Sequence, residues 1–395
     1  MTPSPSLADL VEPVEVSQFL SNVVGGSYRR FPGKEGRFAD LVPWAELDRV
    51  LRQHRLEFPR LRLALDGEPI PAHEYTEMVP TRRTGLVPRL RSGQFAEKLR
   101  AGATLVLDSV QEMFDPVAEL AVRLEHELRE RIQVNLYAGW GKTHGFDVHW
   151  DDHDALILQI SGRKRWRMHG VTRPAPLQRD VELPPKPEGE PIDDFLLCSG
   201  DVLYLPRGQW HDVSAIGEES LHLTIGFNRA TGVDLVAWLA DQLRSDESFR
   251  TDLPRFATAE QRRAHAATLR ARILELAGED VVDRFLADRD AQAPAHPRPG
   301  LPWSATSDLL PDGDDVVVRL LTPRAVLTRD AGRVSLAADG RRLVFAEAAA
   351  PVLEVLVDGV AHPVSELVTA APSLDRSTVV ALLGELLEQG VLAPR

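Results

Sequence analysis

The stretches HWDDHDALILQISGRKRWRMHG (149–170) and SGDVLYLPRGQWHDV (199–213) decide the fold that we expect for this chain. Both contain apolar runs of strand length that end at Gly, Pro or Asp, which is typical of short β-strands separated by turns. Similar runs continue from 132 to 228. The middle of the chain is therefore predicted to be a β-barrel or a β-sandwich.

The first stretch begins with His149, Trp150 and Asp151, which we place at the start of a strand. Residues i and i+2 of a strand point to the same face, so the imidazole and the carboxylate are expected to converge inside a barrel. A trio that adds His153 would also lie on this face, and it stays open as an alternative ligand set.

The second stretch contains the pattern G-x5-P-x-G-x2-H, which runs from Gly200 to His211 and resembles the second motif of the cupin barrels. In that motif the Gly and Pro residues turn the chain, and the His re-enters the barrel opposite the first pair. A ligand set with His153 would leave this Gly/Pro frame unexplained. His211 is therefore the preferred partner of His149 and Asp151.

The first cupin motif is present in a changed form. Asp151 stands where the motif has its second His, and Ala155 stands where it has Glu. Two His and one carboxylate form the facial triad of non-haem iron(II), which leaves coordination positions open for a co-substrate and dioxygen. We therefore expect His149, Asp151 and His211 to form a catalytic metal site. The alternative is a barrel that binds no metal.

On these residues the chain resembles the JmjC-type ribosomal oxygenases, which are iron(II)- and 2-oxoglutarate-dependent protein hydroxylases of the cupin superfamily. The shared features are the H-x-D motif, the apolar strand with Gln, the Gly-Arg turn, the Trp-Arg pair and the second-His region. The resemblance implies a mainly β plus α fold: a double-stranded β-helix barrel, a helical dimerisation segment and a C-terminal winged-helix domain.

The patterns along the chain divide it into three parts. Helical periodicity begins at 231, and a Pro-rich linker covers 291–302. We therefore predict a JmjC/cupin catalytic domain at 1–230, a helical dimerisation segment at 231–295 and a winged-helix-like domain at 296–395. Apolar residues of the helical segment, such as Val233 and Val236, form either an intramolecular core or the two-fold interface of a homodimer that the resemblance implies.

The resemblance also implies residues that bind the keto acid. The family's anchor for 2-oxoglutarate lies fifteen residues after the first His, which is Lys164 here. A lysine at that place would pair with the distal carboxylate of the ligand. The other possibility is that Lys164 and Trp166 face solvent while the arginines beside them face inward. The family's Asn on the strand before the triad matches Asn135, and Thr224 is a further pocket candidate.

Several other polar residues have two possible places. Tyr137 shares a strand face with Asn135, and it either lines the pocket or packs in the core. His222 alternates with leucines, as a hydrogen-bonded histidine of a barrel wall does, whereas His153 and His169 are expected on the surface or in loops. The loop from 139 to 146 carries an additional histidine, His144, on the substrate side of the barrel mouth.

Composition limits the partners of the chain. It has 395 residues, a net charge of −13 and one cysteine, Cys198, which excludes an internal disulfide and fits a cytoplasmic protein. No apolar stretch is long enough for a membrane helix, and no secretion signal is recognisable. From 301 to 395 there are eight Arg and no Lys against thirteen Asp and Glu, so direct contact with nucleic acid is not expected.

The expected function is hydroxylation of a protein side chain with Fe(II) and 2-oxoglutarate as cofactors. The resemblance points to an Arg or His of a ribosomal protein, and the acidity of the chain would suit a basic protein partner. Two alternatives stay open on the same residues. One is hydroxylation of a free amino acid or a peptide natural product, and the other is a regulatory cupin that binds a ligand without turnover.

Overall fold

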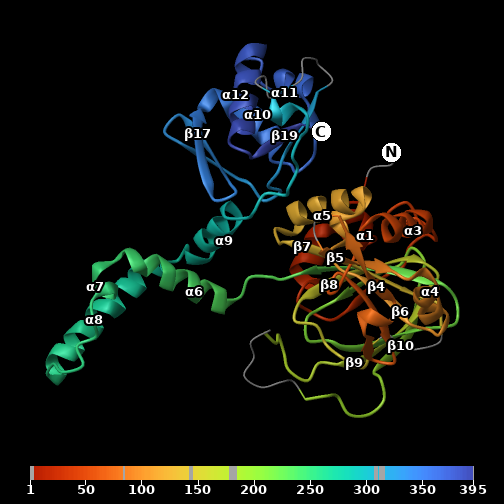
Figure 1. The fold of residues 1–395 in the computed structure, drawn as a ribbon. Helices are drawn as coiled ribbons and strands as arrows, with labels where there is room; N and C mark the ends of the chain where they lie inside the picture. The colour runs from red at the N-terminus through yellow and green to blue at the C-terminus, as the bar shows by residue number, and fades with distance from the viewer. Residues whose placement is uncertain are drawn as a thin grey trace. The chain divides into compact units, whose positions relative to one another are not determined.

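The computed structural model describes residues 4–82, 85–141, 146–177, 185–306, 310 and 316–394, so His144 lies outside the described residues. The chain forms two compact units, Met1–Arg229 and Ala230–Arg395, and each is described by itself (Figure 1). Among the described helices, none combines the length and the apolar character that crossing a membrane requires. The predicted boundary between 295 and 296 falls inside the second unit and stays a prediction.

The first unit is organised around an antiparallel sheet of eight strands, in the order β1-β11-β8-β13-β7-β6-β2-β3. A second sheet of three strands has the order β10-β9-β12. The strand bounds are Arg29–Phe31 (β1), Leu61–Leu65 (β2), Glu68–Ile70 (β3), Thr104–Leu107 (β6), Ile132–Gly139 (β7), Asp154–Ser161 (β8), Arg163–Gly170 (β9), Asp193–Cys198 (β10), Val202–Leu205 (β11), Trp210–Ala215 (β12) and Ser220–Phe227 (β13). The strands predicted between 132 and 228 are therefore confirmed.

Helices cover the outer face of the large sheet. Leu47 of α3 and Leu120 of α5 belong to the same apolar cluster as Leu136 of β7, and Figure 1 shows α1, α3 and α5 along one side of the strands. The helices are Leu7–Val11 (α1), Val16–Gln18 (α2), Trp44–Gln53 (α3), Ser92–Arg100 (α4) and Asp115–Leu128 (α5), with short turns at Phe19–Val23, Ala72–Glu74 and Val110–Glu112 and a hairpin of Thr76–Thr81 (β4) and Gly85–Leu90 (β5). This layer anchors the sheet from outside and leaves its inner face for the site.

The interior between the two sheets is only partly filled by apolar side chains. Ile157 of β8, Trp166 and Met168 of β9 and Leu205 of β11 pack in one small cluster. Along β9 buried and exposed residues alternate from Arg163 onward, which is the pattern of a strand with one face inside a barrel. The remaining inner positions carry polar side chains, and these build the candidate site.

Two glycines of the predicted motifs stand where no other residue fits. Gly162, between β8 and β9, has a φ of +63°, and a Cβ there would lie 2.1 Å from the carbonyl oxygen of Glu219. Gly208 has a φ of +81°, and its Cβ would lie 2.5 Å from Pro176 Cδ. Positive φ and close approach both favour glycine. These turns set the entry of the chain into β9 and β12.

The second unit begins with helices and ends in a small α+β fold. The helices are Gly232–Gln242 (α6), Glu247–Arg250 (α7), Ala259–Leu276 (α8), Val281–Ala291 (α9), Ala350–Leu356 (α10), Val364–Ala370 (α11) and Arg376–Glu388 (α12), with short turns at Leu243–Ser245, Trp303–Ala305 and Glu347–Ala349. One sheet has the order β18-β14-β19 and another β15-β16-β17. Their bounds are Val317–Leu320 (β14), Val326–Asp330 (β15), Arg333–Ala338 (β16), Arg341–Ala346 (β17), His362–Pro363 (β18) and Leu392–Pro394 (β19). The helical pattern predicted from 231 is confirmed. The strand-like runs VVVRLLTP (316–323) and RRLVFAE (341–347) form β14 and β17, whereas β15 and β16 were not predicted.

Candidate metal centre

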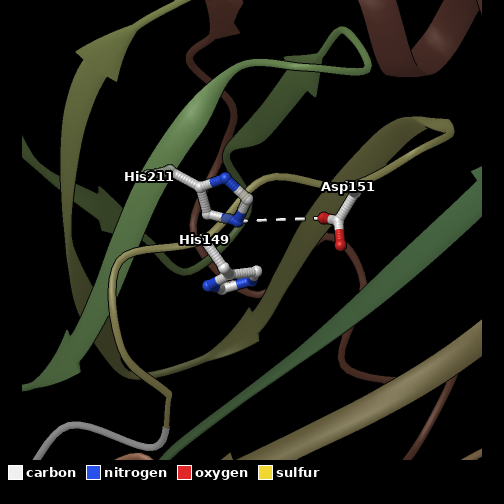
Figure 2. A group of neighbouring side chains, drawn as sticks. All are labelled: His149, Asp151 and His211. Atoms are coloured by element: carbon white, nitrogen blue, oxygen red, sulfur yellow. Dashed lines mark ion pairs between the residues drawn. The ribbon is translucent and has the colours of Figure 1, made fainter. Parts of the chain in front are cut away.

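The structure brings His149, Asp151 and His211 together. Their potential ligand atoms all lie within 4.8 Å of one another, and no other such group of three occurs among the described residues. Figure 2 shows the two imidazoles and the carboxylate pointing into one shared space from three directions. The distance between His211 Nε2 and Asp151 Oδ2 is 3.9 Å, which leaves room for an ion between them.

The backbone reaches this arrangement by a different route from the one predicted. Strand β8 begins only at Asp154, so His149 and Asp151 precede it rather than starting it. His149 instead forms an isolated antiparallel bridge with His211, with N–O distances of 3.0 and 2.8 Å. The carbonyl of Asp151 accepts a hydrogen bond from the N–H of Gly208 at 2.9 Å. The two motifs therefore bind each other directly, and this contact sets the side-chain directions.

Both imidazoles are oriented by backbone carbonyls. Nδ1 of His149 lies 2.7 Å from the carbonyl oxygen of Asp147, and Nδ1 of His211 lies 3.0 Å from that of Gln209. A carbonyl oxygen only accepts, so we assign the proton of each neutral ring to Nδ1. Each Nε2 then carries a lone pair that can bind a metal. A hydrogen bond from the other ring nitrogen to a carbonyl oxygen is usual for a metal-binding His.

Burial keeps His211 in the form that a metal requires. Desolvation lowers the pKa of His211 to about 4, and the nearby His149 adds to this effect. The ring is therefore neutral at neutral pH, and no proton has to leave before a metal binds. His153 does not join the cluster: its Nδ1 lies 3.3 Å from Asp152 Oδ1, and its ring lies against Gly226.

The triad opens onto a cavity of about 240 Å³ in the barrel interior. The cavity is lined by residues of both sheets and of the segment before β8: Arg62, Thr104, Asn135, Tyr137, Phe146, His149, Asp151, His153, Ala155, Ile157, Lys164, Trp166, Leu205, His211, Val213, Ala215, His222 and Thr224. Every residue that the sequence predicts for the metal or the keto acid is in this lining. A small molecule can therefore contact the triad and the other candidates at once.

Lys164 and Trp166 line this cavity, so these two residues of β9 face inward and the arginines beside them face outward. Lys164 is 4% exposed, and its Nζ lies 3.5 Å from the carbonyl oxygen of Tyr137. No salt bridge to Lys164 occurs among the described residues. Burial lowers the pKa of Lys164 to about 7, because desolvation disfavours the charged ammonium.

The remaining predicted residues form two rows across the large sheet. Asn135 pairs with Thr224, and Tyr137 pairs with His222, so each pair points to the same face. The Oδ1 of Asn135 accepts a hydrogen bond from the N–H of Ser109 at 3.1 Å, so this side chain is at least partly bound by a neighbouring segment. Tyr137 lines the cavity, and burial raises its pKa, which keeps the phenol neutral.

Two histidines differ from what the sequence predicts. His222 is 4% exposed and stacks on Tyr137 at 5.0 Å, but its Nδ1 has no hydrogen-bond partner in the described structure. His222 thus lines the cavity, and its Nδ1 does not form the hydrogen bond that the sequence predicts. Burial and the charge of Lys164 lower its pKa well below the usual value. His169 lies in β9 rather than in a loop, with Nε2 2.8 Å from Asp212 Oδ2.

Sequence reasoning missed the wall that β2 and β6 contribute. Arg62 pairs with Val106, which pairs with Tyr137, so all three share a face of the sheet. Arg62 lines the cavity while its Nη2 donates to both oxygens of Asp108, at 2.8 and 3.0 Å. No local motif marks these residues, because only long-range strand pairing brings them to the cavity.

Comparisons with known proteins agree with this geometry. A family model described as JmjC domain matches residues 110–235. Human ribosomal oxygenase 1 is 31% identical over 233 residues, which cover 55% of this chain and 34% of that protein. Rat ribosomal oxygenase 2 is 34% identical over 162 residues, which cover 39% of this chain and 34% of that protein. The chain thus spans about a third of the length of these two relatives.

Solved structures show the same fold over a greater length. YcfD, a ribosomal oxygenase from Escherichia coli, superposes with a TM-score of 0.62 and 21% identity, covering 97% of this chain and 98% of that one. A structure of YcfD in complex with cobalt and 2-oxoglutarate has a TM-score of 0.60 and 20% identity, covering 97% of this chain and 99% of that one.

Residues 110–235 thus match a JmjC domain, and the mixed α/β fold of the chain is similar to that of YcfD. Over this domain the chain is homologous to the proteins named ribosomal oxygenase, and the predicted resemblance to them is confirmed.

Proposed function

We propose that this chain is an iron(II)- and 2-oxoglutarate-dependent oxygenase that hydroxylates an Arg or His side chain of a ribosomal protein. The observation that carries the proposal is the convergence of His149, Asp151 and His211 at a buried cavity. This donor set is the facial triad of non-haem iron(II), whereas a structural zinc site would be closed by a fourth ligand. Names of homologues support the choice of substrate, since they include histidyl-hydroxylase and ribosomal oxygenase.

The residues present fit both groups. Two imidazoles and one carboxylate suit a divalent ion and leave positions open beside it. Lys164 supplies a buried cation that has no carboxylate partner among the described residues, and the distal carboxylate of a keto dicarboxylic acid requires such a cation. The metal and 2-oxoglutarate, when bound, would activate dioxygen for insertion of one oxygen atom into a substrate C–H bond.

The chain itself contributes binding, orientation and exclusion of water. His149, Asp151 and His211 would hold the metal, and Lys164 would fix the far end of the keto acid. Phe146 closes the space beside the metal, since its ring lies 6.1 Å from the rings of both Tyr137 and His149. These aromatic walls would exclude water from the space beside the metal. Asn135 and Thr224 are proposed as further cofactor-binding residues of the cavity wall.

The second unit is proposed to form a homodimer and to help position the protein substrate. Val233 and Val236 of α6 are 62% and 64% exposed in the single chain, which an apolar two-fold interface would explain. We propose that residues 296–395 are a winged-helix-like domain that does not read nucleic acid, in keeping with their acidity. A single cysteine suits the cytoplasm, where we place the enzyme. Light scattering of the purified chain tests the dimer.

An anaerobic titration tests the enzymatic proposal. Iron(II) is added to the protein and then 2-oxoglutarate, and a visible metal-to-ligand charge-transfer band is expected to appear. The variant His211→Ala should show no band because one metal ligand is missing. Absence of a band in the wild-type protein would contradict the oxygenase proposal. Mass spectrometry of ribosomal proteins from a strain without the gene then tests the substrate, since one protein should lose the mass of one oxygen atom.

A further inference from the structure

The indole of Trp166 occupies an unusual position in the cavity. The residue is 2% exposed, and its ring stacks on the ring of His211 with centroids 5.6 Å apart and an interplanar angle of 21°. The centroid of the same ring lies 5.9 Å from the centroid of the His222 ring. Its Nε1 atom is buried and has no hydrogen-bond partner in the described structure. A group that can only donate is therefore left without an acceptor beside the candidate metal centre.

Other tryptophans of the chain do not share this feature. Nε1 of Trp210 donates to Thr172 Oγ1 at 2.8 Å, and Nε1 of Trp238 donates to Asp288 Oδ2 at 2.8 Å. Buried N–H groups are nearly always hydrogen-bonded, because an unpaired one loses its interaction with water without replacement. The unpaired N–H of Trp166 therefore indicates that a hydrogen-bond acceptor enters the cavity with a ligand.

The position of Lys164 indicates what kind of acceptor this is. Lys164 lies two residues before Trp166 on the inward face of β9, and both line the same cavity. Neither group meets a carboxylate among the described residues, although the lysine is a cation and the indole is a donor. A ligand with acceptor oxygens at both of its ends would satisfy them together. His222 is a less selective neighbour, since a neutral imidazole both donates and accepts.

We propose that Trp166 is a second binding residue for the acidic co-substrate and donates its indole N–H to an oxygen of the ligand that Lys164 also holds. This inference rests on the proposed function, because it takes the ligand to be 2-oxoglutarate. The indole does not titrate, so its contribution is independent of pH, unlike that of Lys164. The stacked ring also keeps His211 in place, and the two roles can be separated by substitution.

Calorimetry with Co(II) in place of iron separates the two roles of Trp166, because it measures the binding of 2-oxoglutarate and of the metal without turnover. Trp166→Phe keeps an aromatic ring on His211 and removes only the donor. We expect this variant to bind 2-oxoglutarate about tenfold more weakly than wild type while its affinity for Co(II) stays within about twofold. Trp210→Phe is the matched control, and it should leave the affinity for 2-oxoglutarate unchanged.

Equal affinity of Trp166→Phe and wild type for 2-oxoglutarate would overturn the inference. A wild-type protein that binds Co(II) but no 2-oxoglutarate would instead contradict the proposed function. A second measurement covers the case in which the variant does not fold. In wild-type protein loaded with Zn(II), the Trp166 indole N–H resonance, assigned from triple-resonance spectra, should shift when 2-oxoglutarate is added. A resonance that does not move would overturn the inference as well.

Discussion

The two faces of strand β9 treat their polar side chains in opposite ways. On the outward face each arginine has a carboxylate partner: Arg163 with Glu218, Arg165 with Asp194 and Arg167 with Asp212. On the inward face Lys164 reaches only a backbone carbonyl, and the N–H of Trp166 has no partner in the described structure. On one face of the strand the polar side chains thus have partners within the chain, and on the other face Lys164 and Trp166 lack them among the described residues.

The difference teaches which charges serve folding and which serve binding. The arginines of the outward pairs are partly exposed, and each already has a carboxylate partner. A buried ammonium without a carboxylate lowers the free energy of unfolding, because its transfer from water is not compensated. Selection for stability alone would replace such a lysine by an apolar residue. Its presence beside the metal triad is explained if a ligand supplies the missing negative charge.

The largest expected effect on activity comes from removing a metal ligand, which lies outside β9 but borders the same cavity as its inward face. Asp151→Ala should lower hydroxylation by roughly a thousandfold or more, because the remaining two imidazoles cannot hold the metal in an active geometry. Metal content and succinate formation measure the change. Asp152→Asn is the matched control, since Asp152 contacts His153 rather than the triad. Full metal content in Asp151→Ala would show that this carboxylate is not a ligand.

The next effect concerns the inward lysine itself. Lys164→Met should weaken binding of 2-oxoglutarate by about a hundredfold, since a charge-assisted hydrogen bond is lost. Arg165→Gln on the outward face should leave that affinity unchanged. Calorimetry with Co(II) measures both constants. Similar losses in the two variants would remove the distinction between the faces.

A pH series sharpens the comparison without any ligand. The pKa of Lys164 is about 7 in the folded chain against 10.5 for an ordinary lysine, so between these values the unfolded chain binds more protons. The stability of wild type relative to Lys164→Met should therefore rise as pH increases through this window, by about 2 kcal/mol or more. Below it, the variant should be the more stable protein.

Urea unfolding at about pH 6.5 and about pH 9.5 measures this difference, and the comparison of the two proteins cancels the titrating groups whose pKa does not depend on Lys164. A constant difference between the two pH values would mean that the lysine is already compensated in the unliganded chain.

The smallest effect is expected on the outward face. Arg163→Gln should lower the urea midpoint of unfolding only slightly, because the Arg163 and Glu218 side chains are 48% and 32% exposed. Chemical unfolding measures the change. A loss several times larger would show that the outward pairs also hold the barrel together.

Much of the barrel is predictable from the sequence because its signals are local. The strand-like runs DALILQIS (154–161) and RKRWRMHG (163–170) coincide with β8 and β9, since Gly162 ends one strand and begins the turn to the next. The three triad residues are predictable because each motif has a fixed spacing. Their backbone was predicted wrongly, since the bridge between His149 and His211 joins residues 62 apart and leaves no mark in either motif.

Other parts depend on contacts that no short pattern records. Arg62 enters the cavity wall only because β2 pairs with β6, and β6 with β7. His222 looks like a wall residue in sequence, and only its stacking on Tyr137 beside Lys164 shows that it borders the cavity. The hairpin of β15 and β16 was not predicted because exposed polar residues end β15 and the buried Ser335 interrupts the apolar run of β16.

Anomalous X-ray scattering from crystals of the protein grown with Mn(II) tests most directly whether one divalent ion sits among the three side chains. The predicted result is a single strong peak at bonding distance from Nε2 of His149, Nε2 of His211 and a carboxylate oxygen of Asp151. A peak elsewhere, or no peak at these atoms under saturating Mn(II), would contradict it.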